Sequence, residues 1–149
     1  MSTLYGVNKT LLNLGTVNTI EPELIGAKVR WYYDTYTFLT TESAADIFAL
    51  MGDLLPNEGR VIDWKIAHGD LANNRTLEFG TLADPDEFMT ATDCGAGADV
   101  KNMVDDGIAG AMAFELGSSE NARTPCLTLA GGAAAAVTVQ VGMLIATKG

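Results

Sequence analysis

The most regular pattern in this sequence is an alternation of apolar and small or polar side chains near its C-terminal end. In the stretch AVTVQVGMLI every second residue is apolar, namely Val137, Val139, Val141, Met143 and Ile145. Successive side chains of a β-strand point to opposite faces, so this period of two predicts a strand with one buried face. Such a strand must pack that face against a second layer, which favours a fold built from sheets.

The same period recurs at intervals along the chain, between turns rich in Gly, Asn and Asp. The apolar sets that alternate in this way are Val29, Trp31 and Tyr33; Ile62, Trp64, Ile66 and His68; Leu77 and Phe79; Met112, Phe114 and Leu116; and Leu127 and Leu129. A further short strand is expected at Phe88–Thr90. Roughly seven or eight short strands separated by such turns are typical of an all-β protein. We therefore predict an antiparallel β-sandwich or barrel, of the β-tulip or jelly-roll-like kind.

Two segments depart from a simple strand pattern. Tyr36 and Phe38 have the opposite parity to Val29, Trp31 and Tyr33, which predicts a β-bulge near Asp34-Thr35. The stretch from Ser43 to Met51 allows a helix capped by Ser43, yet Ile47, Ala49 and Met51 also alternate. We favour a strand there because its neighbours are strands.

The first 26 residues have no sustained hydrophobic period. They include the Glu21-Pro22 step and only a weak signal for a short helix over Lys9–Leu14. This segment is interpreted as an extended N-terminal arm, residues 1–26, and the remainder, residues 27–149, as the β domain.

Charge and composition exclude several classes of function. The 149 residues suffice for one domain with a core, and the formal net charge is −10. A chain this acidic is not expected to bind nucleic acid, which requires clustered Lys and Arg, or an anionic membrane surface. No apolar run reaches the about 20 residues of a membrane span, and no signal peptide is evident. The two cysteines, Cys94 and Cys126, are expected to be reduced thiols in a cytoplasmically made protein, with a single bridge as the alternative.

An acidic stretch raises the question of a carboxylate site. Asp84, Asp86, Glu87 and Asp93 fall within ten residues of LEFGTLADPDEFMTATD. A calcium loop places oxygen ligands at alternating positions and then a Gly, but Phe88 stands at the third ligand position. Because Pro85 also favours a turn, we expect a solvated acidic turn between two strands. An adventitious divalent cation is the less favoured alternative.

The residues that could carry catalysis lack partners at useful spacing. His68 is the only histidine, and its parity places it with buried residues. Ser118-Ser119 occur in a turn and not in a nucleophile elbow, so a hydrolytic triad has little support. Cys94 has neither a CxxC partner nor a basic neighbour that would lower its pKa. We expect no enzyme, no cofactor and no structural metal.

Aromatic side chains offer one further alternative. Trp31, Tyr32, Tyr33 and Trp64 have the residue types of a sugar-binding platform. Aromatic residues at strand spacing are more often part of a core or an interface, which is the interpretation we favour.

The segment LPNEGRVIDWKIAHGDLANNRTLEFGTLADPDEFMTATD, Leu55 to Asp93, resembles a segment of tailed-bacteriophage virion proteins. In those proteins an LP.G..V turn leads into a strand and is followed by L..G...D.D.F..A.D. The opening MSTLYGVNKTLLN and the terminal GGAAAAVTVQVGMLI are also similar to the ends of such proteins. The resemblance covers most of the chain, although only the central segment is distinctive.

The resemblance implies a capsid decoration, or cement, protein, a family with no catalytic residues. Such a protein binds the major capsid protein on the outer surface of the head, often as a homotrimer, after synthesis in the bacterial cytoplasm. The arm would then supply the contacts with neighbouring subunits, through Leu4, Tyr5, Val7, Leu11 and Leu12. Two alternatives stay open: another virion component, such as a tail, adaptor or head-fibre subunit, or a displayed carbohydrate-binding module. The second requires several of Trp31, Tyr32, Tyr36 and Trp64 to be exposed in one patch.

Overall fold

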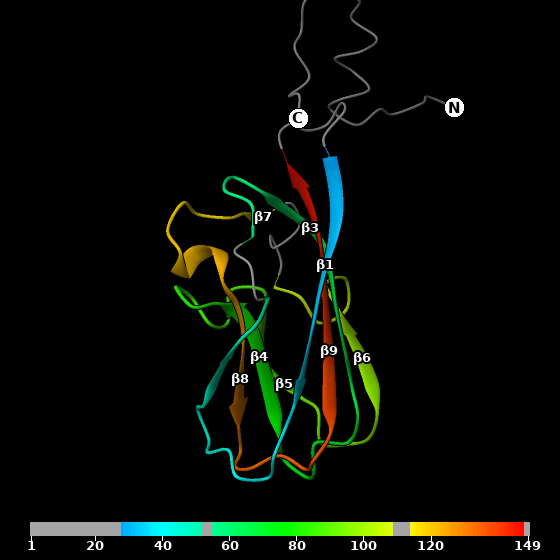
Figure 1. The fold of residues 1–149 in the computed structure, drawn as a ribbon. Coiled ribbons are helices and arrows are strands. Elements are labelled where there is room, and N and C mark those ends of the chain that lie inside the picture. Colours follow the sequence, from blue (N-terminus) through cyan, green and yellow to red (C-terminus); the bar gives the residue numbers. More distant parts are fainter. Residues whose placement is uncertain (1–27, 52–54, 109–113, 148–149) are drawn as a thin grey trace, which may run out of the picture.

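The fold was obtained as a computed structural model, which describes residues 28–51, 55–108 and 114–147. These residues form strands and one short 3-10 helix (Figure 1). In chain order the elements are β1 (Lys28–Thr37), β2 (Ile47–Ala49), β3 (Arg60–His68), β4 (Thr76–Thr81), β5 (Met89–Asp93), β6 (Asp99–Asn102), β7 (Phe114–Glu115), η2 (Asn121–Arg123), β8 (Pro125–Ala130) and β9 (Thr138–Thr147). Within the described ranges, no helix is long and apolar enough to cross a bilayer.

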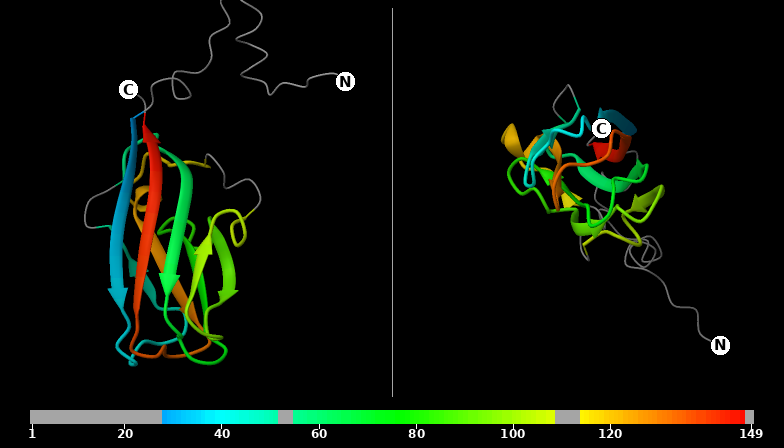
Figure 2. Two further views of the ribbon diagram at one scale, coloured as in Figure 1. Left: turned by 90° about the vertical axis from the view of Figure 1, so that its right-hand side faces the viewer. Right: turned by 90° about the horizontal axis from the view of Figure 1, so that it is seen from below.

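The strands make two antiparallel sheets that pack face to face (Figures 1 and 2). The five-stranded sheet has the order β1-β9-β3-β6, with β7 also paired to β3. The four-stranded sheet has the order β2-β8-β4-β5. The predicted all-β sandwich is therefore confirmed. The arm predicted at residues 1–26, with its weak helix signal, lies outside the described residues.

The core lies between the two sheets. Val139, Val141, Met143 and Ile145 of β9 are buried, as the alternation predicts. Trp64 of β3 meets Phe79 of β4 across the sandwich, with ring centroids 5.4 Å apart in an edge-to-face arrangement. Other predicted inward residues that the structure buries are Ile66, His68, Leu77, Leu116, Leu127 and Leu129. Met112 lies outside the described residues.

The bulge predicted near Asp34-Thr35 is wrong. β1 pairs with β9 in unbroken register from Lys28↔Thr147 to Thr37↔Thr138. The two parities are instead the two faces of one regular strand, which both carry aromatic rings. The register shift occurs in β3, between Val61 and Asp63. Ile62 is the extra residue there, so it is only half-buried while Val61 is buried, contrary to the predicted phase.

The segment from Ser43 to Met51 contains a strand and not a helix, but the strand is short. Its start is a turn in which the Asp46 carboxylate accepts the Ser43 N–H at 2.6 Å. Of the expected alternating face, Ile47 is 49% exposed, whereas Phe48 turns inward and packs on Phe38. The strand expected at Phe88–Thr90 is β5, which begins one residue later.

Candidate functional site

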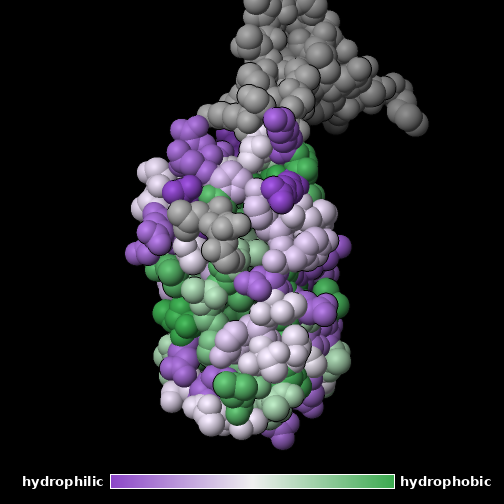
Figure 3. Space-filling model, in the orientation of Figure 1, coloured by the Kyte–Doolittle hydropathy of each residue, from purple (hydrophilic) through white to green (hydrophobic). Residues whose placement is uncertain are grey.

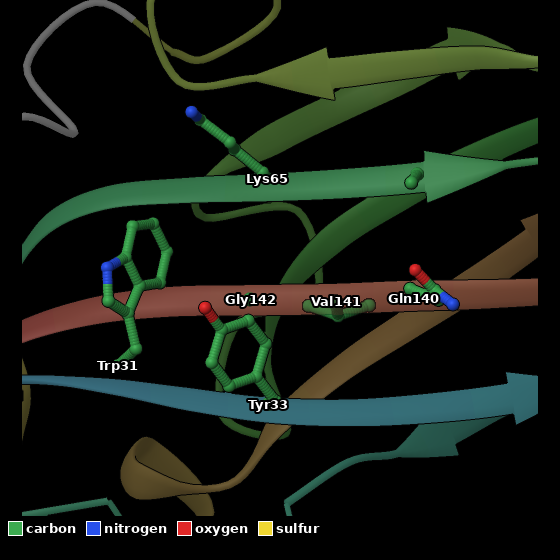
Figure 4. A pocket seen from close by; sticks show the side chains of 7 residues that line it. Trp31, Tyr33, Lys65, Gln140, Val141 and Gly142 are labelled. Carbon is green, nitrogen blue, oxygen red and sulfur yellow. The ribbon is translucent and has the colours of Figure 1, made fainter.

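A groove of about 300 Å³ crosses the outer face of the five-stranded sheet (Figure 4). Its lining comes from three adjacent strands and consists of Trp31, Tyr33, Lys65, Ala67, Gln140, Val141 and Gly142. Cross-strand pairing sets this arrangement, because Tyr33 of β1 and Lys65 of β3 both lie opposite Gly142 of β9. Residues that face one another in neighbouring antiparallel strands point to the same side of the sheet.

Two aromatic rings line the groove on the side of β1. Trp31 and Tyr33 are two residues apart on β1 and share its outer face, with ring centroids 5.8 Å apart and planes inclined by 20°. Tyr33 is 73% exposed. Figure 4 shows both rings extending from β1 toward β9. A near-parallel pair of rings, of which Tyr33 is largely exposed, is an apolar surface available to a partner.

Gly142 is what allows the rings to lie on the sheet. A Cβ at this position would stand 3.2 Å from Cε1 of Tyr33 and 3.5 Å from Cζ3 of Trp31. A larger side chain would lift the Tyr33 ring away from β9. Glycine within a strand therefore marks a close approach here.

Polar groups also line the groove. The Lys65 ammonium and the Gln140 amide make no hydrogen bond or ion pair with any residue that the structure describes. No Asp or Glu is among the residues that line the groove. Hydrophobic and hydrophilic residues intermix over the face of the domain seen in Figure 3. Lys65 is thus the charged residue of the groove, and it makes no ion pair with a residue that the structure describes.

The aromatic platform that was considered as an alternative is not gathered in one exposed patch. Trp64 is fully buried, and Tyr36 packs against Phe48 at a centroid distance of 4.4 Å. Tyr32 has the opposite parity to Trp31, and the Arg30 guanidinium lies over its ring. Only Trp31 and Tyr33 of the proposed set lie together on an exposed face. The glycine in the AVTVQVGMLI alternation is the sequence signal that could have pointed to this pair.

The acidic stretch is a turn, as predicted. The Thr81 N–H donates to the Asp84 carbonyl at 2.9 Å, and the Asp84 N–H donates back to the Thr81 carbonyl at 3.0 Å. The side chains of Asp84 and Asp86 are exposed, and a hydrogen bond with Asp86 raises the pKa of Asp84. Asp93 lies at the end of β5, where it accepts the Gly95 N–H. In residues 28–51, 55–108 and 114–147, no three His, Cys, Asp or Glu side chains are grouped to hold a metal ion.

A smaller polar cavity of about 190 Å³ lies beside His68, Cys94, Asp99 and Lys101. His68 is buried, and its Nδ1 lies 2.7 Å from the Gly69 carbonyl oxygen, to which it donates. Lys101 pairs with Asp99 at 2.8 Å. Burial raises the pKa of the Cys94 thiol to about 11, so the thiolate is disfavoured at neutral pH. Cys94 and Cys126 are separate free thiols.

The residues predicted to contact capsid or neighbouring subunits, Leu4, Tyr5, Val7, Leu11 and Leu12, lie outside the described residues. Their prediction remains a hypothesis drawn from the sequence alone.

Comparison with known proteins gives a likeness of fold. No protein-family model matches the sequence, and no curated protein does. Among solved structures, the fold is similar to a chain in the structure described as "Cyanophage Pam1 capsid asymmetric unit". The two chains superpose with a TM-score of 0.62 and 17% sequence identity, over 82% of this chain and 86% of the other. At this level of identity the comparison shows that the two chains share a fold.

Proposed function

We propose that the chain is a structural protein of a tailed-phage virion that binds the outer surface of the head and stabilises the capsid lattice. The observation that carries the proposal is the shared fold with a chain of a cyanophage capsid asymmetric unit, which extends over 82% of this chain. The sequence resemblance supports the same proposal. Its distinctive segment, Leu55 to Asp93, includes β3 of one sheet and β4 and β5 of the other, so it spans both layers of the core.

In the proposed mechanism, added contacts between capsomers resist the internal pressure of the head. A head packed with DNA is under outward pressure, and a protein that bridges capsomers adds contacts that must break before the shell opens. Weak contacts repeated by symmetry reinforce one another, because each bound site raises the effective concentration at the next. In this proposal the β domain sits on the major capsid protein as a homotrimer, and the arm at residues 1–26 reaches the neighbouring subunits.

The proposal includes the absence of catalysis. His68, Asp84 and Asp86 are the groups most suited to acid–base work, yet the first is buried and the other two are exposed in a turn. Replacing all three with Asn or Gln is expected to leave assembly and infectivity intact. A loss of some measured turnover, with the fold unchanged, would contradict this part of the proposal.

The test is binding of the purified full chain to phage heads that lack it. We expect saturable binding, a copy number that matches a repeated lattice position, and heads that resist heating better once decorated. Deletion of residues 2–20 should leave the circular-dichroism spectrum nearly unchanged and sharply reduce occupancy. Parental occupancy after the deletion would refute the bridging role of the arm. A copy number that matches a ring at a single vertex would favour an adaptor, tail or head-fibre subunit.

A further inference from the structure

We propose that the groove on the outer face of the five-stranded sheet binds an acidic glycan. In this proposal the sugar rings stack on Trp31 and Tyr33, and a carboxylate of the glycan pairs with Lys65. The site is independent of the proposed role on the phage head, since it concerns a face of the isolated domain. Figure 4 shows the side chains that carry the argument.

The aromatic pair provides the stacking surface. Folding normally buries an aromatic ring of this size, yet Tyr33 is 73% exposed and Trp31 is half-buried beside it. Their planes differ by only 20°, so the two rings offer nearly parallel faces as a stacking surface. The C–H groups on one face of a pyranose ring are apolar and fit such a surface, while the sugar hydroxyls stay hydrated at the edges.

Polar groups of the groove can form hydrogen bonds with the hydroxyls of a sugar. Gln140 contributes an amide, which both donates and accepts hydrogen bonds, to the lining of the groove on the far side of Val141 from the rings. The phenol of Tyr33 and the indole N–H of Trp31 add further groups that hydroxyls can meet. A pocket with an apolar floor and a few polar groups at its border is the usual form of a small-ligand site.

The positive charge in the groove favours an acidic ligand. Lys65 is the only charged residue that lines the groove, and it has no ion-pair partner among the described residues. Asp63 precedes it by two residues on β3 and lies on the same face of the sheet, opposite Leu144, but it does not line the groove and makes no ion pair with Lys65. An ammonium without a counter-charge forms a charge-assisted hydrogen bond with a ligand carboxylate. A uronic-acid polymer offers this carboxylate on every ring.

The size of the groove favours a short glycan segment over a protein. Its volume of about 300 Å³ is at the small end of ligand pockets. Seven residues line it, whereas a stable protein interface uses roughly 20–30 residues on each side. Each groove is therefore expected to hold its ligand weakly, and several copies displayed on one particle would bind a polymer more tightly.

The test compares a charged and an uncharged probe of the same sugar sequence: an oligogalacturonate, and that oligomer with every carboxylate converted to its methyl ester. Binding to the full chain is measured by calorimetry and by tryptophan fluorescence. Trp64 is fully buried, so a change in emission reports on Trp31. We expect the free acid to bind at least about tenfold more tightly than the ester, and added salt to narrow the difference.

Three variants locate the site. Tyr33→Ala and Trp31→Ala are each expected to weaken binding of the acid by about tenfold or more. Lys65→Gln should leave stacking intact and bring the acid and the ester to the same affinity. Val100→Ala is the matched control, because Val100 is exposed on β6 of the same sheet, outside the groove, and should bind as the parent does. Circular dichroism and thermal melting establish that each variant is folded.

Several results would overturn the proposal. These are failure of the parent to bind the oligogalacturonate at millimolar concentration, equal affinity of the parent for acid and ester, or parental affinity in folded Tyr33→Ala and Trp31→Ala. None of these results bears on the head-binding experiment, which contains no glycan. Failure to decorate heads, in turn, would leave the glycan site standing.

Discussion

Gly80, the residue before the last in strand β4, lies directly against the backbone of Asp84. A Cβ at residue 80 would overlap the Asp84 carbonyl oxygen and stand 2.6 Å from the carbonyl carbon of Pro85. The contact arises because Thr81 and Asp84 exchange backbone hydrogen bonds, which fold the acidic turn back onto the strand. Only a residue without a side chain fits between the strand and the turn.

We therefore predict that Gly80→Ala lowers the free energy of unfolding by about 3 kcal/mol. The new Cβ would clash with backbone atoms of Asp84 and Pro85, which cannot move without distorting the turn. Urea denaturation measures the effect. Gly142→Ala is the matched control. Its Cβ would meet the exposed ring of Tyr33, which is free to move, so the loss should stay below about 1 kcal/mol. Equal losses in the two variants would contradict this account of the turn.

A charge on the inner face of β9 should prevent folding. Val139 is fully buried, and an aspartate there would be an unpaired charge in the core, which costs several kcal/mol and exceeds what a small domain can lose. Val139→Asp is expected to abolish soluble folded protein. Gln140→Asp places the same charge one residue later on the exposed face and should melt close to the parent. If both variants behave alike, the assigned phase of β9 is wrong.

The two buried thiols predict a loss of stability at high pH. Burial raises the pKa of Cys94 and of Cys126 from 9.0 to about 11. Between these values the unfolded chain releases protons that the folded chain keeps, so the free energy of unfolding falls as the pH rises. Urea titrations at several pH values measure the slope. The double variant Cys94→Ala/Cys126→Ala should flatten it, with a remainder from Tyr36, whose pKa burial and Glu42 also raise. An unchanged slope would show that the thiols do not titrate as described.

Glu42 predicts a loss of stability at low pH. This buried carboxylate accepts the Leu39 N–H at 2.5 Å and the Tyr36 hydroxyl at 3.5 Å. Burial raises its pKa, but these donors and nearby backbone N–H groups outweigh that effect, and the pKa lies below the usual 4.5. The stabilisation is therefore present above pH 4.5 and is lost as the pH falls through the lower folded value.

At pH 7 the variant Glu42→Gln should be about 1 kcal/mol less stable than the parent, because a charge-assisted hydrogen bond becomes a neutral one. The difference should shrink as the pH falls below 4.5. Glu120→Gln, at an exposed position, is the control and should change little. Thermal melting at a series of pH values measures both. If Glu42→Gln is less stable than the parent by the same amount at every pH, the loss of stability comes from packing alone and not from the charge.

The sequence by itself determined where most of the strands lie, although not β6, and in β4, β8 and β9 it also determined residues that face the core. The period of two places Val139, Val141, Met143 and Ile145 on one face, and the structure buries all four. Trp64 and Ile66 follow the same rule. The information is local, because a side chain's direction in a strand depends only on its position in that strand. From such alternation and the turns between strands, an antiparallel sandwich could be predicted without coordinates.

Only the tertiary structure decided what local periodicity leaves open. In β1 both faces carry aromatic rings, so the pattern did not reveal whether Phe38 or Tyr33 meets the core, and a bulge was wrongly inferred. The answer depends on β9, which pairs with β1 from more than a hundred residues away in the chain, as Lys28↔Thr147 shows. The groove has the same origin. Tyr33, Gly142 and Lys65 become neighbours through strand order and register, which are set by the packing of the whole core and not by any one segment.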